Sequence, residues 1–368
     1  MSGFFPFLFS ASPFFSITLA EGLILLGIVL WAGKLYRQRK LESPGFFFPL
    51  LAFAISSITS AFLSLNPEVS LKDTREVFLY LIPPVVLMLK GEWLKKGVVY
   101  GGGAAAFLGV LREFFVKQER LTGFVGHYMT EGGLMMMAFL FIFSLILFEK
   151  INLPYFLSLF FVTIALVLTL TRSSWVGAFL GACYLLYKKK KILLGIFVPL
   201  MIVAVLISPS KIRQRAFSIF SRTNPTNVER INMWKIGLRM ATVRPIFGIG
   251  QNMASRIYPE FNRKALPPRE IPHLHNTYLQ ILVERGVVGL GLFLLFLFWA
   301  FREIQKRGRD AVALGALGVL IGFLIAGFFE YNFGDSEVKI LFLILLTLPF
   351  TNKREVNNDK NSAETKAL

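Results

Sequence analysis

The sequence predicts an all-α polytopic membrane protein, and three observations lead to that prediction. The 368-residue chain is 55% hydrophobic and has a mean hydropathy of +0.60, which places it in the membrane class. Apolar runs of about 17–25 residues, the length that spans a bilayer, recur along the chain. Clusters of Lys and Arg follow alternate runs. We therefore expect about 11–12 transmembrane helices and no nucleic-acid partner.

Eleven apolar runs are long enough to be expected as helices. In chain order they are residues 16–33, 44–65, 77–90, 97–116, 128–148, 151–170, 173–187, 192–208, 278–301, 311–330 and 336–350. Residues 3–15 are also apolar, but Pro6 and Pro13 interrupt them, and proline inside a helix removes a hydrogen bond. This segment is a re-entrant arm, a broken twelfth helix or an extension of the first helix.

The basic clusters fix an orientation. They follow the first, third, seventh, ninth and eleventh runs, so eleven helices place all of them on one side, and short cytoplasmic loops are the ones enriched in Lys and Arg. The expected division of the chain is N-terminal transmembrane helices over residues 1–208, a large outer loop over 209–275, C-terminal transmembrane helices over 276–350 and a disordered cytoplasmic tail over 351–368.

The outer loop is strongly basic. Residues 209–272 contain only three acidic residues, Glu229, Glu260 and Glu270, against twelve basic ones. The basic residues are Lys211, Arg213, Arg215, Arg222, Arg230, Lys235, Arg239, Arg244, Arg256, Arg263, Lys264 and Arg269. Because outer segments normally avoid such an excess, it suggests an anionic ligand at the outer face. The alternative is a basic amphipathic helix resting on anionic membrane lipids.

Local patterns predict short helices within this loop. Thr226 and Glu229 have the spacing of an N-cap and its capping-box partner. Ile231, Trp234, Leu238 and Ala241 then recur at helical spacing as an apolar stripe. Pro245 ends the helix, and Gly248-Ile249-Gly250 follows as a turn that other backbone can approach closely. The proline-rich stretch 267–272 is expected to be extended.

The sharpest pattern is His275-Asn276 followed after nine residues by Gly286-x-x-Gly289. On one continuous helix, His275 would lie at the water interface, with both glycines about three turns deeper on one face that a partner helix packs against. Histidine has a reference pKa of about 6.5 and accepts protons near neutral pH. Spacing alone favours an ordinary helix-capping or interfacial histidine.

These residues resemble the O-antigen ligase/polymerase superfamily, whose members include WaaL-type ligases, Wzy-type polymerases and protein O-oligosaccharyltransferases. The likeness extends over residues 120–350. It rests on the His-Asn segment with Tyr278, Gln280 and Glu284-Arg285-Gly286, on Leu121-Thr122-Gly123-Phe124, on Leu168–Trp175, and on Arg230-x3-Trp234 running to Pro245-x2-Gly248-x-Gly250. The resemblance implies a GT-C-like membrane glycosyltransferase and, most closely, an O-antigen ligase of the WaaL type.

The resemblance also implies a reaction and roles for particular residues. A glycan on undecaprenyl diphosphate is transferred to a sugar hydroxyl of lipid A–core at the periplasmic face of the cell inner membrane, without a metal or cofactor. His275 would be the general base, with Arg172 and Arg230 stabilising the diphosphate. His273 is a candidate substitute two residues away, although helical geometry would turn it to a different side. The expected substrate-binding residues are Asn276, Arg239, Arg244, Arg256, Tyr278 and His127.

Other functions remain open from the sequence. A polymerase shares the donor and differs in the acceptor; a single dominant outer loop favours the ligase. A protein O-oligosaccharyltransferase is a further member of this class. A lipid flippase or transporter needs ionisable groups inside the bilayer, for which Glu21, Glu284 and Arg285 are the candidates. Glu284 and Arg285 are also adequately explained as partners of each other.

Overall fold

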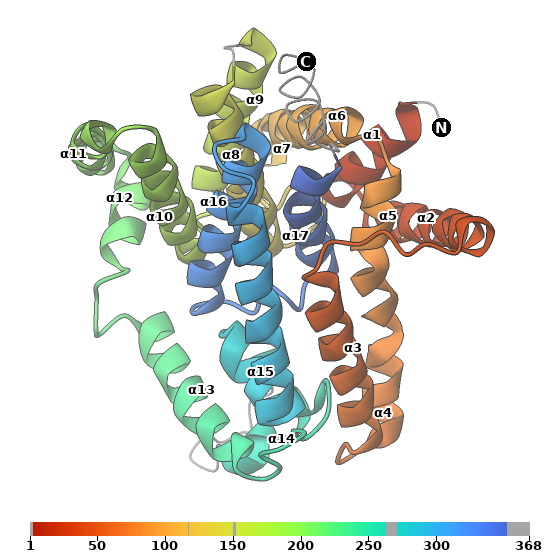
Figure 1. The fold of residues 1–368 in the computed structure, drawn as a ribbon. Coiled ribbons are helices and arrows are strands. Elements are labelled where there is room, and N and C mark those ends of the chain that lie inside the picture. Colours follow the sequence, from red (N-terminus) through yellow and green to blue (C-terminus); the bar gives the residue numbers. More distant parts are fainter. Residues whose placement is uncertain (1–2, 117, 150–151, 263–270, 352–368) are drawn as a thin grey trace, which may run out of the picture.

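A computed structural model of the chain describes residues 3–116, 118–149, 152–262 and 271–351. Every regular element in these residues is helical, which confirms the predicted all-α class (Figure 1). The predicted tail, residues 351–368, lies outside the described residues except for Thr351. The same holds for residues 263–270, which include most of the proline-rich stretch.

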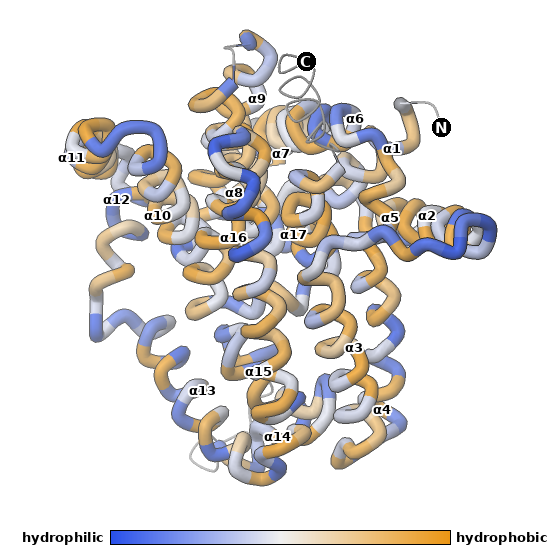
Figure 2. Tube along the Cα trace, viewed as in Figure 1, coloured by the Kyte–Doolittle hydropathy of each residue, from blue (hydrophilic) through white to orange (hydrophobic). Residues whose placement is uncertain are grey.

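Three described helices are long and apolar enough to cross a bilayer: α2 (Ile17–Gln38), α8 (Tyr128–Phe148) and α15 (Thr277–Gln305). A pair of helical segments bent by 119°, Pro67–Met88 and Gly91–Glu113, forms a fourth span or a re-entrant loop. Shorter apolar helices accompany them, and α16 is hydrophobic over most of its length (Figure 2). The chain therefore has the helices of a polytopic membrane protein, while the expected number of crossings stays a prediction.

Each of the eleven apolar runs contains helix, and the run at 278–301 is broken at Gly286. The remaining elements are α1 (Phe4–Ala11), η1 (Ser12–Phe14), α3 (Phe47–Phe62), α4 (Pro67–Asp73), η2 (Thr74–Leu81), α5 (Ile82–Met88), α6 (Gly91–Lys96), η3 (Gly97–Gly101), α7 (Gly102–Val116), α9 (Leu153–Leu168), α10 (Arg172–Lys189), α11 (Lys191–Ile207), α12 (Ser210–Phe217), α13 (Pro225–Ala241), α14 (Met253–Phe261), α16 (Ala311–Gly327), α17 (Ser336–Thr347) and η4 (Leu348–Phe350). The predicted run at 77–90 continues directly from α4, so the helical segment begins before this run.

The centre of the molecule is a tight packing of α8, α10 and α16. A Cβ added at Gly177 of α10 would lie 2.6 Å from the Gly322 carbonyl oxygen of α16, and one at Gly181 would lie 2.9 Å from the Gly318 oxygen. Small residues let helix backbones approach closely where lipid supplies no hydrophobic drive for association. This packing fixes the position at which α16 ends, and the candidate site begins there.

The N-terminal apolar segment is a separate short helix. Ser16 caps α2 through a hydrogen bond from the Leu19 amide at 3.3 Å, so α2 starts anew there. α1 packs on α6, where Ser10 Oγ donates to the Leu94 carbonyl at 2.8 Å. The extension of the first helix, one of the three expected possibilities, is therefore wrong.

The basic loop contains α12, α13 and α14, as the predicted short helices require. The cap of α13 is Asn224, which accepts a hydrogen bond from the Thr226 amide at 3.1 Å, so Thr226 as N-cap is wrong. The helix starts earlier because Pro225 at the first position has no amide hydrogen to leave unsatisfied. Met233, Ile236 and Met240 form the buried stripe of α13.

That buried stripe corrects the predicted one. Ile231 and Leu238 are exposed, whereas Trp234 and Ala241 are partly buried beside the stripe. The buried face packs on Leu274 and Leu279 at the start of α15, forming a second hydrophobic core under the loop. This core holds the histidine-bearing segment against α13.

α15 is broken at Gly286, whose backbone angles are φ 66° and ψ −171°. The rings of Tyr278 and Phe293, fifteen positions apart, have centroids 6.5 Å apart. On a straight helix with a rise of about 1.5 Å per residue they would be roughly 22 Å apart. The two halves of α15 therefore fold back on each other, and the expected straight helix with His275 at one end and the glycines three turns deeper is wrong.

The segment that follows α13 packs against the break at Gly286. The Val287 amide donates to the Pro245 carbonyl at 2.8 Å, and the Gly250 amide donates to the Glu284 carbonyl at 3.0 Å. A Cβ at Gly286 would lie 2.2 Å from the Ile246 oxygen, and one at Gly248 would lie 2.3 Å from the Glu284 backbone. The expected close approach at Gly248 and Gly286 is confirmed, but the partner of Gly286 is the turn that contains Ile246 and not a helix.

Candidate active site

Glu330 is the centre of the candidate site. It lies in the turn between α16 and α17 and is 3% exposed. His275 Nδ1 lies 3.1 Å from each of its carboxylate oxygens, and His273 Nε2 lies 3.4 Å from Oε1. Arg230 of α13 donates to Oε2 at 3.3 Å. One buried carboxylate thus contacts two histidines and an arginine from the basic loop.

Local structure holds the histidine turn against the Glu330 turn. His275 has a positive φ of 49°, which turns the chain just before α15. Asn276 is the N-cap of α15, accepting from the Leu279 amide at 2.9 Å, while its Nδ2 donates to the Phe328 carbonyl at 3.1 Å. Thr277 Oγ1 donates to the Glu330 carbonyl at 2.8 Å. These bonds fix the distance between imidazole and carboxylate.

His273 and His275 share one side of the site, contrary to the expectation that helical geometry would turn them apart. Both precede the first residue of α15, and their ring centroids are 4.2 Å apart. Sequence reasoning assumed a helix through these positions. The non-helical turn instead brings both rings to Glu330.

Electrostatics assign different states to the groups in this cluster. Burial alone would raise the pKa of Glu330, but the hydrogen bond with His275 and the charges around it hold that pKa at about 2. Burial lowers the pKa of His273 to about 4, so its ring is neutral at pH 7. Because an ionised carboxylate only accepts hydrogen bonds, His275 Nδ1 donates to Glu330, so Nε2 is the ring nitrogen that this contact leaves available to a substrate.

Several arginine side chains lie next to Glu330 and the two histidines. Arg172, at the start of α10, is 7% exposed and donates to the Ser218 carbonyl at 2.9 Å. Arg215 donates to the Leu170 carbonyl at 3.0 Å. Burial, followed by the charges of Arg120, Arg172 and Arg230, lowers the pKa of Arg215 to about 10, so it remains charged at neutral pH. We call Arg120, Arg172, Arg215 and Arg230 the arginine cluster.

The arginine cluster has the character of an anion site. Its members repel one another, since the charge of Arg230 is felt at both Arg172 and Arg215. Arg230 Nε is buried and has no hydrogen-bond partner among the described residues. Guanidinium groups bind phosphate oxygens in a bidentate fork, so a diphosphate placed here would relieve the repulsion and satisfy the free donor.

The other predicted substrate-binding residues divide into near and distant ones. His127 is near: its Nδ1 lies 3.3 Å from Thr130 Oγ1, and its charge acts on His273. Tyr278 donates to the Leu324 carbonyl at 2.7 Å and packs on Phe328, which is a structural role. Asn276 serves as the helix cap described above.

Arg239, Arg244 and Arg256 are exposed, and no contact among the described residues joins them to Glu330. Arg244 instead bonds to the Leu63 carbonyl at the end of α3. The charge of Arg256 acts on Asp73, which lines a different cavity. The structure therefore brings Arg172, Arg230 and His275 together and leaves these three arginines apart.

Sequence reasoning missed Glu330, Arg120 and Arg215. Glu330 is 55 positions from His275 in the sequence, so no local spacing connects them. Its signal was a carboxylate at the end of an apolar run on the expected outer side. Arg120 directly precedes the Leu121-Thr122-Gly123 segment, and Arg215 was counted in the basic loop without being singled out.

His273, His275 and Glu330 also offer ligand atoms within 4.8 Å of one another, which suits a metal ion. Two imidazoles and one carboxylate are a common set for transition metals. Arg230 at the same carboxylate places a fixed positive charge where a cation would sit. The absence of a metal requirement stays a prediction that chelation tests.

Part of the chain resembles known proteins. Residues 156–294 match the model of the family described as O-antigen ligase. The chain is 27% identical over 139 residues to "Putative polysaccharide ligase RP358" of Rickettsia prowazekii, covering 36% of this chain and 33% of that protein. It is 28% identical over 115 residues to "Exopolysaccharide production protein ExoQ" of Rhizobium meliloti, covering 28% of this chain and 26% of that protein.

The matches thus span about a third or less of the length of these relatives. The family match includes His273, His275 and three members of the arginine cluster, whereas Arg120 and Glu330 lie outside it. Over residues 156–294, this polytopic membrane protein is therefore similar to the O-antigen ligase family.

Proposed function

We propose that the protein is a membrane glycosyltransferase of the ligase kind. It transfers a glycan from undecaprenyl diphosphate to a sugar hydroxyl of lipid A–core, on the periplasmic face of the inner membrane. The observation that carries this proposal is the pairing of His275 Nδ1 with buried Glu330 at 3.1 Å beside the arginine cluster. A base and an anion site thereby lie next to each other, as glycosyl transfer from a diphosphate requires.

The chemistry follows from these positions. His275 Nε2 takes the proton of the acceptor hydroxyl while the acceptor oxygen bonds to the anomeric carbon of the donor. The bond from that carbon to the phosphate oxygen breaks, and its electron pair leaves with undecaprenyl diphosphate. Arg172, Arg215 and Arg230 stabilise the charge that builds on the diphosphate. Glu330 stays ionised and stabilises the imidazolium, as the carboxylate does in a catalytic triad.

A polymerase is the second candidate. The likeness to a protein named for exopolysaccharide production favours it, because a polymerase would use the same donor chemistry with a lipid-linked glycan as acceptor. The two candidates differ in the product, so one experiment separates them.

Expression in a ligase-deficient host, followed by gel analysis of lipopolysaccharide, tests the proposal. The intact chain should restore a ladder of capped molecules, and His275→Ala should lower transfer by at least about 10²-fold because base catalysis is lost. Lys235→Ala, an exposed basic position on α13, is the control and should retain the ladder. An unchanged lipopolysaccharide profile with longer carrier-bound chains would favour the polymerase instead.

Chelation completes the test. Transfer in membranes washed with EDTA should equal transfer in untreated membranes. A loss restored by one particular divalent ion would show that the two histidines and Glu330 act as metal ligands.

A further inference from the structure

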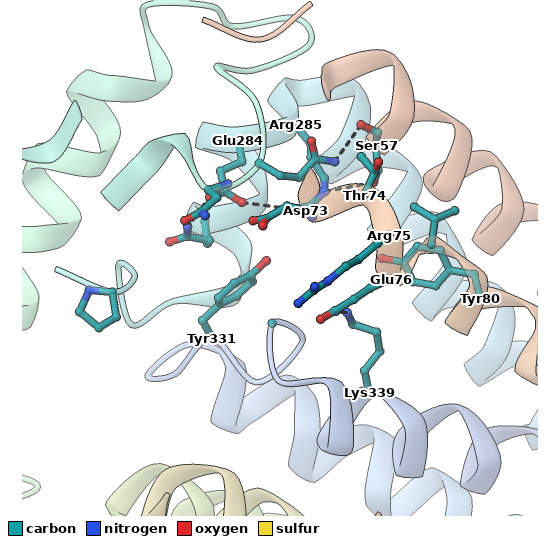
Figure 3. A pocket seen from close by; sticks show the side chains of 16 residues that line it. Ser57, Asp73, Thr74, Arg75, Glu76, Tyr80, Glu284, Arg285, Tyr331 and Lys339 are labelled. Carbon is teal, nitrogen blue, oxygen red and sulfur yellow. Dashed lines mark hydrogen bonds and ion pairs between the residues drawn. The ribbon is translucent and has the colours of Figure 1, made fainter. Parts of the chain in front are cut away.

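A cavity of about 170 Å³ lies beside the candidate active site (Figure 3). Side chains from α3, α4, η2, α15 and α17 line it, together with the turn that contains Tyr331 and the Gln251-Asn252 segment before α14. Tyr331 directly follows Glu330, and its ring centroid is 6.0 Å from that of His273. Neither Glu330, the two histidines nor the arginine cluster lines this cavity. It is therefore a separate space that shares one wall with the site.

The charges around the cavity are balanced. Three cationic and three carboxylate side chains line it: Arg75, Arg285 and Lys339, and Asp73, Glu76 and Glu284. Two of the cations are already paired, Lys339 with Glu76 at 2.8 Å and Arg285 with Glu284 at 3.4 Å. An anionic diphosphate would meet three carboxylates here. A neutral ligand whose hydroxyls both donate and accept hydrogen bonds matches the lining better.

One buried polar atom in the wall has no partner. Gln251 is 4% exposed, and its Nε2 donates to the Ser57 carbonyl at 2.8 Å. Its Oε1 has no hydrogen-bond partner among the described residues. Buried acceptors are rarely left unpaired, so this oxygen is available to a hydroxyl of a bound molecule.

The size and the walls suit one sugar ring. A buried water needs about 10–15 Å³, so the space holds on the order of ten water-sized groups, comparable to one monosaccharide with its substituents. Tyr331 and Tyr80 add aromatic surface, while Asp73 and Arg75 stand exposed at the mouth. In Figure 3 the Arg75 side chain extends into the space between Tyr331 and Glu76.

We propose that this cavity binds a neutral, hydroxyl-rich sugar ring of the acceptor. The proposal rests on the proposed function. In an inverting transfer, the attacking oxygen approaches the anomeric carbon from the face opposite to the leaving group. The arginine cluster adjoins Glu330 through Arg230, and the cavity adjoins it through Tyr331. Donor diphosphate and acceptor sugar would then both adjoin the His275–Glu330 pair.

Direct binding to the purified full chain tests the subsite. The probes are lipid A–core isolated from the ligase-deficient host and undecaprenyl-diphosphate-linked glycan, with Kd measured for each. Arg75→Ala and Asp73→Ala remove polar groups at the mouth, and both positions are exposed, so folding is retained. Each should raise the Kd for lipid A–core at least about tenfold, the effect of losing a hydrogen bond to a charged group. Binding of the donor should change by less than about twofold.

Lys72→Ala is the matched control, because Lys72 is exposed on the same helix and pairs with Glu68 outside the cavity. It should change neither Kd. An unchanged Kd for lipid A–core in both mouth variants would overturn the subsite, and so would weakened donor binding. If the mouth variants bind lipid A–core more weakly and the donor as before, but the intact chain restores no ladder, the subsite stands and the proposed ligase reaction fails. If the ladder is restored but the mouth variants bind lipid A–core as the wild type does, the ligase reaction stands and the subsite fails.

Discussion

Glu330 is the residue on which the basic side chains of the candidate site converge. Its carboxylate orients the His275 ring, faces His273 and pairs with Arg230. The sequence pattern pointed to His275, Arg172 and Arg230, and the structure places these residues in one region. Glu330 could not be predicted, because the contact depends on how α15 and α16 pack and not on spacing along the chain.

Replacing Glu330 by Gln tests its role in positioning the imidazole. The amide keeps the size of the side chain but loses the charge that stabilises the imidazolium, so we expect kcat to fall by about 10²- to 10⁴-fold. The KM for the donor should change little. Glu337→Gln, in the first turn of α17, is the control. Wild-type turnover in the Glu330 variant would exclude the proposed pairing.

His273 should make the stability of the protein depend on pH. Its pKa is about 4 in the folded chain and about 6.5 when unfolded, so the unfolded chain binds more protons between these values. The contribution of His273 to the free energy of unfolding is full above pH 6.5 and is lost as the pH falls towards 4. Between pH 7.5 and 5 the loss is about 2 kcal/mol.

His273→Gln should remove this loss of stability between pH 7.5 and 5. Thermal unfolding of the variant and the wild type in detergent, at both pH values, measures the difference. Burial raises the pKa of Asp335 to about 7, which acts in the opposite direction, but equally in both proteins. His127→Gln is the control. Parallel pH dependence in the wild type and the His273 variant would rule out a neutral, buried His273.

At the scale of elements, the break in α15 brings two glycine-containing segments of the chain into contact with each other. Gly248 and Gly250 lie against the Glu284-Arg285-Gly286 segment, so the two glycine-containing patterns are two halves of one backbone contact. The helix itself was predictable from its apolar run. The break was not, because a single glycine within a helical pattern is compatible with an unbroken helix.

Alanine at Gly286 or Gly248 should destabilise the protein. Both glycines have positive φ, 66° and 76°, and an added Cβ would lie within 2.3 Å of backbone atoms. We expect the amount of folded protein recovered in detergent to drop sharply for both variants. Gly291→Ala in the same helix meets no atom within 4 Å and should behave as the wild type. Normal recovery of Gly286→Ala would contradict the backbone contact described here.

For the molecule as a whole, composition and charge distribution predicted the class of fold well. Apolar runs alone locate helices because a segment inside a bilayer must satisfy its own backbone hydrogen bonds. They do not reveal which helices bend, as α15 and the 119° pair do. The side of the membrane on which α13 lies stays a prediction based on basic clusters.

Single cysteines test that topology. The lone Cys183 is replaced by Ser, and cysteine is then introduced at exposed Lys235 in α13 or at Arg309 between α15 and α16. A membrane-impermeant maleimide should label position 235 in intact spheroplasts and position 309 only after the membrane is permeabilised. The opposite labelling would place the arginine cluster inside the cell and refute the proposed reaction.

The distribution of the candidate site along the chain has a practical consequence for building chimaeras. Exchanging residues 156–294 for those of a relative would import both histidines with a foreign α10, α13 and α15, yet leave the native turn that holds Glu330 and Tyr331. Such a hybrid would join one protein's base to another protein's carboxylate. Grafts meant to change sugar preference therefore need to include the turn between α16 and α17 as well.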